Sequence, residues 1–108
     1  MKILIMGGLS ALLALSCALL LAGDPAKGKE LFTAKCAPCH DVTGNGKEAI
    51  ARLFQVTMKP LASKEIQAKP DDELRKITTK GSGKMVAVKV GEQEAGDIIA
   101  FVRTLAKK

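Results

Sequence analysis

The stretch Cys36-Ala37-Pro38-Cys39-His40, CAPCH, is the most informative part of this sequence. It contains two of the three cysteines in the chain and the single histidine. Two thiols and one imidazole within five residues point to a redox, metal or cofactor site. The rest of the sequence has to show which of these chemistries uses all three side chains.

The chain begins with an apolar segment that is typical of an export signal. Lys2 is followed by an uncharged run rich in leucine and alanine, and this run stops at Asp24, where charged residues begin. A positive start and an apolar middle are the plan of a signal peptide. We expect residues 1–23 to be removed as a signal peptide, with the cut after Ala22 or Gly23.

Two alternatives for this segment stay open. Its length is close to the roughly 20 apolar residues of a membrane span, so residues 1–23 would also serve as an uncleaved anchor. Cys17 would be a lipidation site, although the residues before it match a lipoprotein signal poorly. In each case CAPCH lies outside the cytoplasmic membrane. We therefore expect a periplasmic or otherwise exported protein that meets a membrane only through a retained or lipidated leader.

Residues 24–108 form the predicted domain, which is small and poor in aromatic side chains. The whole chain has 108 residues, three Phe, no Trp and no Tyr, and a formal net charge of +6. A domain of this size gains marginal stability from burial alone and commonly depends on a disulfide, a metal or a cofactor. We expect something other than side chains to fill part of its core.

The domain is predicted to be mainly α. Asp24 and Pro25 form a cap with proline at the first helical position, and the helix that follows leads into CAPCH, where we expect Pro38 to end it. A glycine turn at 44–46 precedes a short helical pattern, whereas residues 55–69 have no clear period and are interpreted mostly as loop.

Two further helices are expected toward the C-terminus. The first begins with three acidic residues at 71–73 and ends before Gly81, as the dipole and C-cap rules prefer, with Leu74 and Ile77 facing inward. The second has the most regular pattern in the chain. Its apolar stripe consists of Ala95, Ile98, Ile99, Val102 and Leu105.

Four chemistries use two cysteines at the CAPCH spacing. A structural disulfide suits an exported chain, whereas a thioredoxin-like pair needs a βαβ setting that is absent. A zinc site needs four ligands, and beyond this motif only Cys17 could contribute. Covalent haem attachment uses every residue, because two thiols form thioethers and the adjacent imidazole binds the iron. We predict haem attached through Cys36 and Cys39 with His40 as an axial ligand, and a disulfide is the alternative.

The sequence around the motif resembles small class I c-type cytochromes. "GKELFTAKCAPCH" (28–40) is similar to their N-terminal helix and haem motif, "GNGK" (44–47) to their glycine-bearing turn, and "DIIAFVRTL" (97–105) to their last helix. The resemblance covers nearly all of residues 25–106. It implies the cytochrome c fold, with about three to five helices wrapped around one covalently bound haem.

The resemblance also implies how the two terminal helices meet. They are expected to cross, with Gly28 allowing their close approach. Phe32 and Phe101 are expected to pack near the crossing.

The second axial ligand of the iron has two methionine candidates outside the leader, Met58 and Met85. Met85 lies between a helix that ends in glycines and the final helix, where a flexible loop would carry its sulfur to the iron. Met58 is interpreted as a packing residue under the haem edge. The resemblance places the distal methionine at Met85, but the proline and the aromatic residue that often follow it are replaced by Val86 and Val88. We expect weaker ligation than in typical relatives.

Iron bound by both His40 and Met85 has no free site for a substrate. Such a centre is suited to one-electron transfer, and a thioether ligand raises its potential relative to a bis-histidine haem. We expect a monomeric monohaem electron carrier between redox proteins, not an enzyme. The alternatives are a haem protein that binds a gas or peroxide through a labile distal ligand, and the electron-entry subunit of a larger oxidoreductase.

Lysines flank the motifs that should surround the haem. They are Lys35, Lys47, Lys84 and Lys89. They form either an ordinary solvated surface or a positive ring that steers the haem edge toward partners with acidic docking faces. A nucleic-acid partner is not expected, because an exported domain without aromatic platforms has little reason to bind one.

Overall fold

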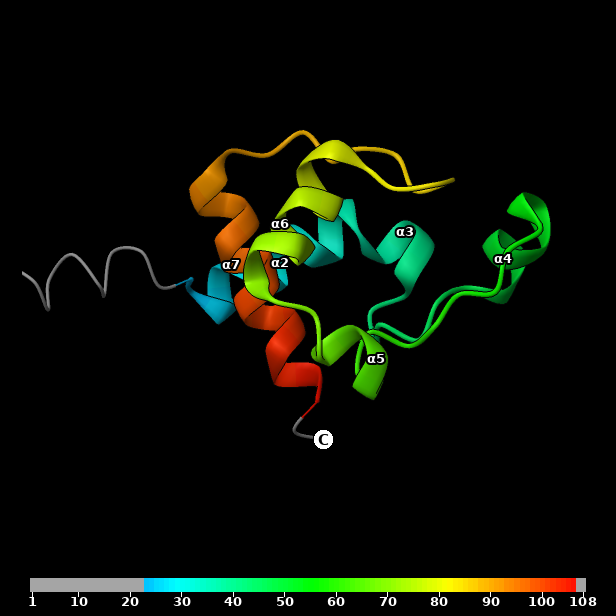
Figure 1. Cartoon of the computed structure of the whole chain (residues 1–108), viewed down its shortest axis with the longest axis horizontal. Helices are drawn as coiled ribbons and strands as arrows, with labels where there is room; N and C mark the ends of the chain where they lie inside the picture. The colour runs from blue at the N-terminus through cyan, green and yellow to red at the C-terminus, as the bar shows by residue number, and fades with distance from the viewer. Residues whose placement is uncertain (1–22, 107–108) are drawn as a thin grey trace, which may run out of the picture.

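The computed structural model describes residues 23–106, which form six helices (Figure 1). The β structure in this range is limited to an isolated antiparallel bridge between Ser82 and Met85. The mainly α class is therefore confirmed, and two four-residue helices raise the helix number above the three to five expected. The helices are α2 (Pro25–Lys35), α3 (Ala37–His40), α4 (Glu48–Phe54), α5 (Lys64–Gln67), α6 (Asp71–Lys80) and α7 (Glu92–Leu105).

The expected signal peptide falls almost entirely outside the described residues. Cys17, the cut site after Ala22 and the last two lysines also lie outside them. Within residues 23–106, every helix is too short or too polar to cross a membrane.

Helix α2 begins as the sequence predicts but ends earlier. The Asp24 side chain caps it by accepting a hydrogen bond from the backbone N–H of Ala26, at 3.0 Å. The helix stops at Lys35, three residues before the proline that was expected to end it. Continued helix would need an N–H at Pro38, which proline lacks. Pro38 instead occupies the first turn of α3, where this donor is not required.

The two C-terminal helices match their predictions closely. Helix α6 ends at Lys80, and its C-cap Gly81 has a positive φ of 81°, which glycine adopts without strain. All five residues of the predicted apolar stripe are buried in α7. In α6, Leu74 is buried and Ile77 is partly buried, as expected from their spacing.

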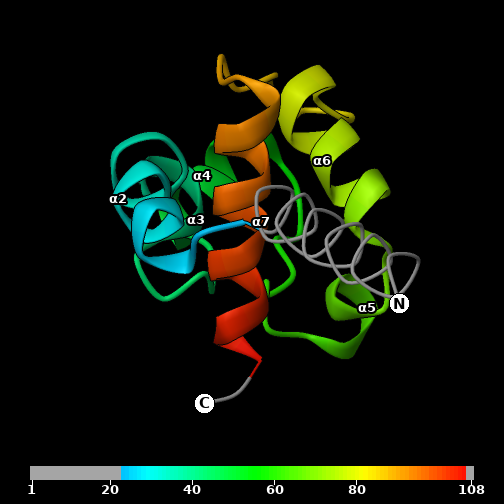
Figure 2. The ribbon, with the colours of Figure 1, turned by 90° about the vertical axis from the view of Figure 1, so that its left-hand side faces the viewer.

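The α2–α7 crossing brings the two ends of the domain together. Figure 2 shows α7 between α2 on one side and α6 on the other. A Cβ added to Gly28 would lie 1.8 Å from the backbone carbonyl oxygen of Asp97, so only glycine permits this approach. The rings of Phe32 and Phe101 have centroids 5.2 Å apart with an interplanar angle of 54°. The expected crossing, with glycine contact and paired aromatic rings, is confirmed.

Asp97 also fastens the start of α2 to α7 through its side chain. The residue is 3% exposed, and its Oδ1 accepts hydrogen bonds from the backbone N–H of Asp24 at 2.8 Å and from Gln93 Nε2 at 3.2 Å. A buried carboxylate is costly without such partners.

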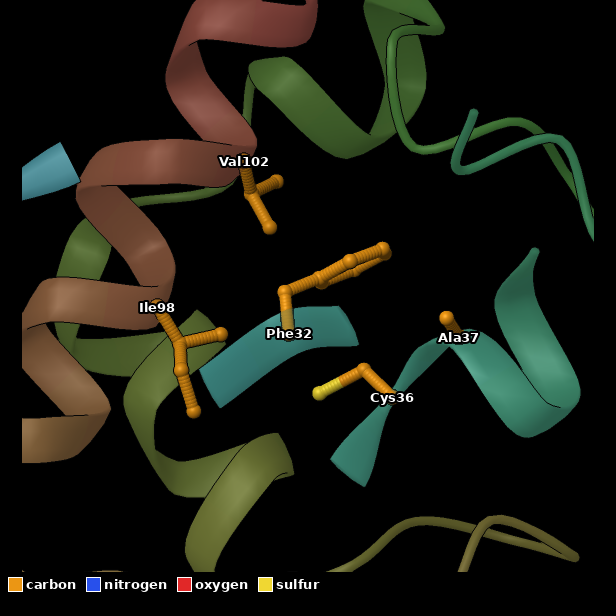
Figure 3. Packing of buried hydrophobic residues seen from close by; sticks show 5 residues of the cluster. All are labelled: Phe32, Cys36, Ala37, Ile98 and Val102. Atoms are coloured by element: carbon orange, nitrogen blue, oxygen red, sulfur yellow. The ribbon is translucent and has the colours of Figure 1, made fainter. Parts of the chain in front are cut away.

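The core cluster extends from this crossing to the motif (Figure 3). Phe32 lies at its centre, with Ile98 and Val102 of α7 on one side and Cys36 and Ala37 on the other. The first residues of CAPCH are therefore part of the packed core. This arrangement fixes the position of the turn that follows.

Arg103 connects α7 to the segment between α5 and α6. Its guanidinium donates to the backbone carbonyls of Gln67 at 2.8 Å and Lys69 at 2.6 Å, and to Asp71 Oδ1 at 2.7 Å. The side chain of Gln67 returns a hydrogen bond to the backbone carbonyl of Val102, at 3.1 Å. A segment without apolar periodicity is thus held by polar contacts, which sequence patterns do not reveal.

Helix α4 stands apart from the other helices at the end of an extended arm (Figure 1). None of its seven residues is buried, and Leu53 is 72% exposed. The arm comprises residues 44–61. Its base is closed by a hydrogen bond from the Leu61 N–H to the Gly44 carbonyl, at 3.0 Å. The arm is therefore held at its base, and its helix buries no residue.

A matched pair of glycine substitutions tests the crossing. We expect Gly28→Ala to lower the free energy of unfolding by about 1–3 kcal/mol, because the new methyl group overlaps the Asp97 carbonyl. Gly96→Ala is the control, since it also lies inside a helix but its Cβ would meet Arg75 Nη2 at an ordinary 3.6 Å. Alanine there should be neutral or stabilising, by up to about 1 kcal/mol.

Guanidinium unfolding followed by far-UV circular dichroism measures both variants. Equal effects of the two substitutions would contradict the close-approach role of Gly28.

Candidate haem-binding site

The CAPCH motif is wound into a single helical turn at the end of α2. The backbone N–H groups of Cys39 and His40 both donate to the carbonyl of Cys36, at 3.1 and 2.8 Å, and Asp41 donates to Ala37 at 2.8 Å. Residues three apart on a helical turn lie on the same side. The turn therefore presents Cys36 and Cys39 to the same region.

Both cysteines and His40 line one large cavity with a volume of about 530 Å³. This volume falls within the range of roughly 300–1,000 Å³ that is typical of ligand and cofactor sites. Met58 and Met85 line the same cavity. The structure thus brings together all four residues predicted to hold a cofactor, together with the competing methionine.

The rest of the lining is mainly apolar. The aliphatic and aromatic lining residues are Phe32, Ile50, Phe54, Val56, Leu61, Ile66, Leu74, Ile77, Val86, Val88, Ile98, Ile99 and Val102. These side chains come from every helix except α3, and from the segments between them. The cavity therefore has an apolar lining that comes from both ends of the domain, which suits an apolar group.

The two cysteines are free thiols with different surroundings. Cys36 is buried and Cys39 is exposed. Burial raises the pKa of Cys36 to about 11, because the thiolate loses its hydration. Cys36 is therefore neutral at physiological pH and packs like an apolar group. Residues 23–106 contain no cluster of three or more His, Cys, Asp or Glu side chains that could hold a metal ion.

His40 is positioned for a ligand inside the cavity. Burial lowers its pKa below the usual value, so the imidazole is neutral at neutral pH and keeps a lone pair for binding. Its Nδ1 is buried and has no hydrogen-bond partner within the part of the chain that the structure describes. A buried polar atom of this kind calls for a partner. The two thiols, this imidazole and the apolar walls fit a covalently bound haem.

The backbone after His40 turns back sharply to close the site. Asp41 adopts a φ of 65°, and its carboxylate accepts hydrogen bonds from the Thr43 hydroxyl and N–H at 2.6 and 3.2 Å. The N–H groups of Gly46 and Lys47 then donate to the carbonyls of His40 and Cys39, at 2.7 and 3.0 Å. The glycine turn expected from the sequence thus holds the end of the motif in place.

The two methionines lie in different settings. A Cβ added to Gly46 would lie 2.8 Å from the Cβ of Met58, so Met58 is packed against the glycine turn. Met85 is partly buried in the loop between α6 and α7. The Ser82 and Met85 backbones bond each other in both directions, at 3.0 and 2.9 Å, and form a tight turn. This turn is exposed at Val86, whose side chain is 80% accessible.

Lysine is the only charged residue type in the cavity lining within residues 23–106. The four lining lysines are Lys35, Lys59, Lys69 and Lys84. Of the predicted ring, Lys35 and Lys84 line the cavity, Lys47 lines a second, smaller hollow, and Lys89 lines neither. Lys59 and Lys69 were not predicted, because they lie in the segment without periodicity. Each of these two has an acidic partner, Glu65 and Glu73 respectively.

Comparison with known families agrees with the site. The model of the family described as cytochrome c oxidase, cbb3-type, subunit III matches residues 23–102, and the chain belongs to this family. It is a c-type cytochrome, and hence an electron carrier. Proteins of this class carry covalently bound haem c and are typically exported.

Two relatives illustrate the match. Cytochrome c-554(547) of Halothiobacillus neapolitanus is 28% identical over 90 residues, which cover 78% of this chain and 99% of the relative. The structure of KustC0563 c-type cytochrome superposes with a TM-score of 0.61 at 23% identity, covering 72% of this chain and 95% of that one. The second likeness shows that the cytochrome c fold is shared.

Proposed function

We propose that the chain carries a single haem c attached through Cys36 and Cys39, with His40 and Met85 as the axial ligands of the iron. The observation that supports this most is the convergence of all four side chains on one apolar cavity of about 530 Å³. One CAPCH motif is present in the sequence, which supports one haem. The site would act in one-electron transfer outside the cytoplasmic membrane.

The residues of the cavity have distinct tasks in this proposal. Bound haem supplies a one-electron redox centre whose potential is set by its axial ligands and by the polarity around it. The core residues Phe32, Ile98 and Val102 exclude water on the side of the α2–α7 crossing. His40 binds from a short helix that is part of this packed side, whereas Met85 binds from a loop.

An export signal that ends at Ala22 is part of the same proposal. A Cβ added to Gly23 would lie 2.1 Å from the carbonyl oxygen of Gly96, so Gly23 packs closely against α7. This contact supports a folded domain that begins at Gly23 and a cut after Ala22. The intact mass of the exported protein distinguishes this start from Asp24, from an uncut chain and from a lipidated one.

The lysines at the cavity support a redox partner with an acidic docking face. Lys35 and Lys84 have no acidic partner among the described residues, whereas Lys59 and Lys69 are partly neutralised. Unpaired positive charge beside the cavity steers negatively charged partners toward the haem edge. Lys35 and Lys84 are therefore the charges that matter most in this proposal.

The role of electron-entry subunit is the second candidate. The description of the family names an oxidase subunit. However, nearly the whole length of the curated relative, itself named as a cytochrome, is covered by this chain. We favour a free carrier, and co-purification of a stable partner at low salt would contradict it.

A pair of methionine variants tests the distal ligand. In Met85→Ala the sixth position of the iron should open, so the reduced protein should bind carbon monoxide, detected as a shift of the Soret band. Met58→Ala is the matched control, because Met58 lines the same cavity but packs on Gly46. We expect this variant not to bind carbon monoxide. Its free energy of unfolding should fall by at most about 5 kcal/mol, the upper end for truncation of a core methionine.

Carbon monoxide binding by Met58→Ala alone would reverse the assignment. Binding by the unmodified protein would favour the gas- or peroxide-binding alternative.

A charge reversal tests the electrostatic steering. Lys35→Glu, beside the cavity, should slow oxidation by anionic hexacyanoferrate(III) several-fold at low ionic strength. The difference should fade near 1 M salt, where the screening length is only about 3 Å. Lys27→Glu changes the same charge on the same helix away from the cavity and serves as the control. Stopped-flow rates that are equal for both variants at every salt concentration would argue against a local steering role.

A further inference from the structure

One hydrogen bond joins two parts of the cavity wall that are distant in sequence. The ammonium group of Lys84 donates to the backbone carbonyl of Phe54, at 2.6 Å, across 30 residues of chain. Lys84 precedes Met85, and Phe54 is the last residue of α4. Both Lys84 and Phe54 line the cavity and are exposed to solvent, so this contact lies on its outer edge.

The Met85 loop is fastened at its base but has few contacts at its tip. At the base, the N–H of Val88 donates to the Thr78 carbonyl in α6, at 2.8 Å. At the tip, the Ser82–Met85 bonds are internal to the turn, and Gly83 has a φ of 56° with open space around its Cβ position. Among the described residues, the Lys84 contact is the only hydrogen bond from residues 82–87 to the α4 arm.

The acceptor side suits a cation. The carbonyl of Phe54 lies at the C-terminus of α4, where the helix dipole places partial negative charge. The next residue, Gln55, adopts a left-handed conformation with a φ of 54°, which ends the helix. A hydrogen bond from an ammonium group to such a carbonyl is stronger than one between neutral groups. Because α4 has no buried residue, this bond also restrains the arm.

We propose that Lys84 is a positioning residue that closes the distal side of the cavity and holds the Met85 loop against it. The bond between its ammonium group and the Phe54 carbonyl joins the Met85 loop to the end of α4, two edges of the site that have few buried contacts. This role rests on the proposed ligation by Met85. The bond also restrains the Met85 loop, which lacks the proline that often follows the distal methionine and has Val86 there instead.

Three variants of the full haem-loaded protein test this role. Lys84→Met keeps the side-chain length but removes the donor, whereas Lys84→Arg keeps a cationic donor. Lys89→Met is the matched control, because Lys89 is an exposed lysine in the same loop that does not line the cavity. The measurement is the rate at which cyanide binds to the oxidised protein, which requires the methionine to leave the iron.

We expect Lys84→Met to bind cyanide about tenfold faster than the unmodified protein, the factor that corresponds to loss of one charge-assisted hydrogen bond. Lys89→Met should bind at the unmodified rate, and Lys84→Arg should lie close to it. A docking role alone would leave cyanide binding equal in the two methionine variants, and that result would overturn the proposal.

The absorption spectrum of the unmodified oxidised protein distinguishes failure of the Lys84 role from failure of the proposed ligation by Met85. If the sulfur-to-iron(III) charge-transfer band is present and the rates are equal, only the role of Lys84 fails. If the band is absent, ligation by Met85 fails and the proposed role of Lys84 is overturned with it.

Discussion

The close approach of α2 and α7 at Gly28 is the constraint on which the rest of the structure depends. It allows the backbone carbonyl of Asp97 to occupy the space where any other residue would place a Cβ. The carboxylate of Asp97 then holds the N-terminus of α2, and Phe32 enters the core beside Phe101. Because α2 leads directly into Cys36, the same crossing sets the position of the cofactor motif.

The two sides of the cavity differ in how firmly they are built. On one side, the motif continues from a packed helix and is tied by backbone hydrogen bonds to the glycine turn. On the other, the Met85 loop and the α4 arm carry few buried contacts. In the proposed ligation, His40 is therefore the fixed ligand and Met85 the ligand whose retention depends on loop contacts. Loosely packed segments open with low free energies, which makes single contacts such as that of Lys84 influential.

Residue patterns were sufficient for the parts of this protein that follow local rules. Capping by Asp24, the stripe of α7 and the Gly81 terminus depend on neighbours within a few residues, so the sequence predicts them well. Helix α5, the Arg103 network and the lining lysines Lys59 and Lys69 depend on contacts across 30 or more residues or on an aperiodic segment. The end of α2 at Lys35 could have been anticipated from Pro38. Proline has no backbone N–H, so it cannot donate the hydrogen bond that would continue the helix.

The absorption spectrum of the oxidised protein, extended into the near infrared, is the most direct test of this account. After expression with c-type haem maturation, we expect a haem c spectrum with the weak sulfur-to-iron(III) charge-transfer band, as His40 and Met85 ligation requires. A haem c spectrum without this band would contradict the proposed distal ligand and favour an open or differently bound iron. A protein that matures without haem would contradict the interpretation of the CAPCH cavity itself.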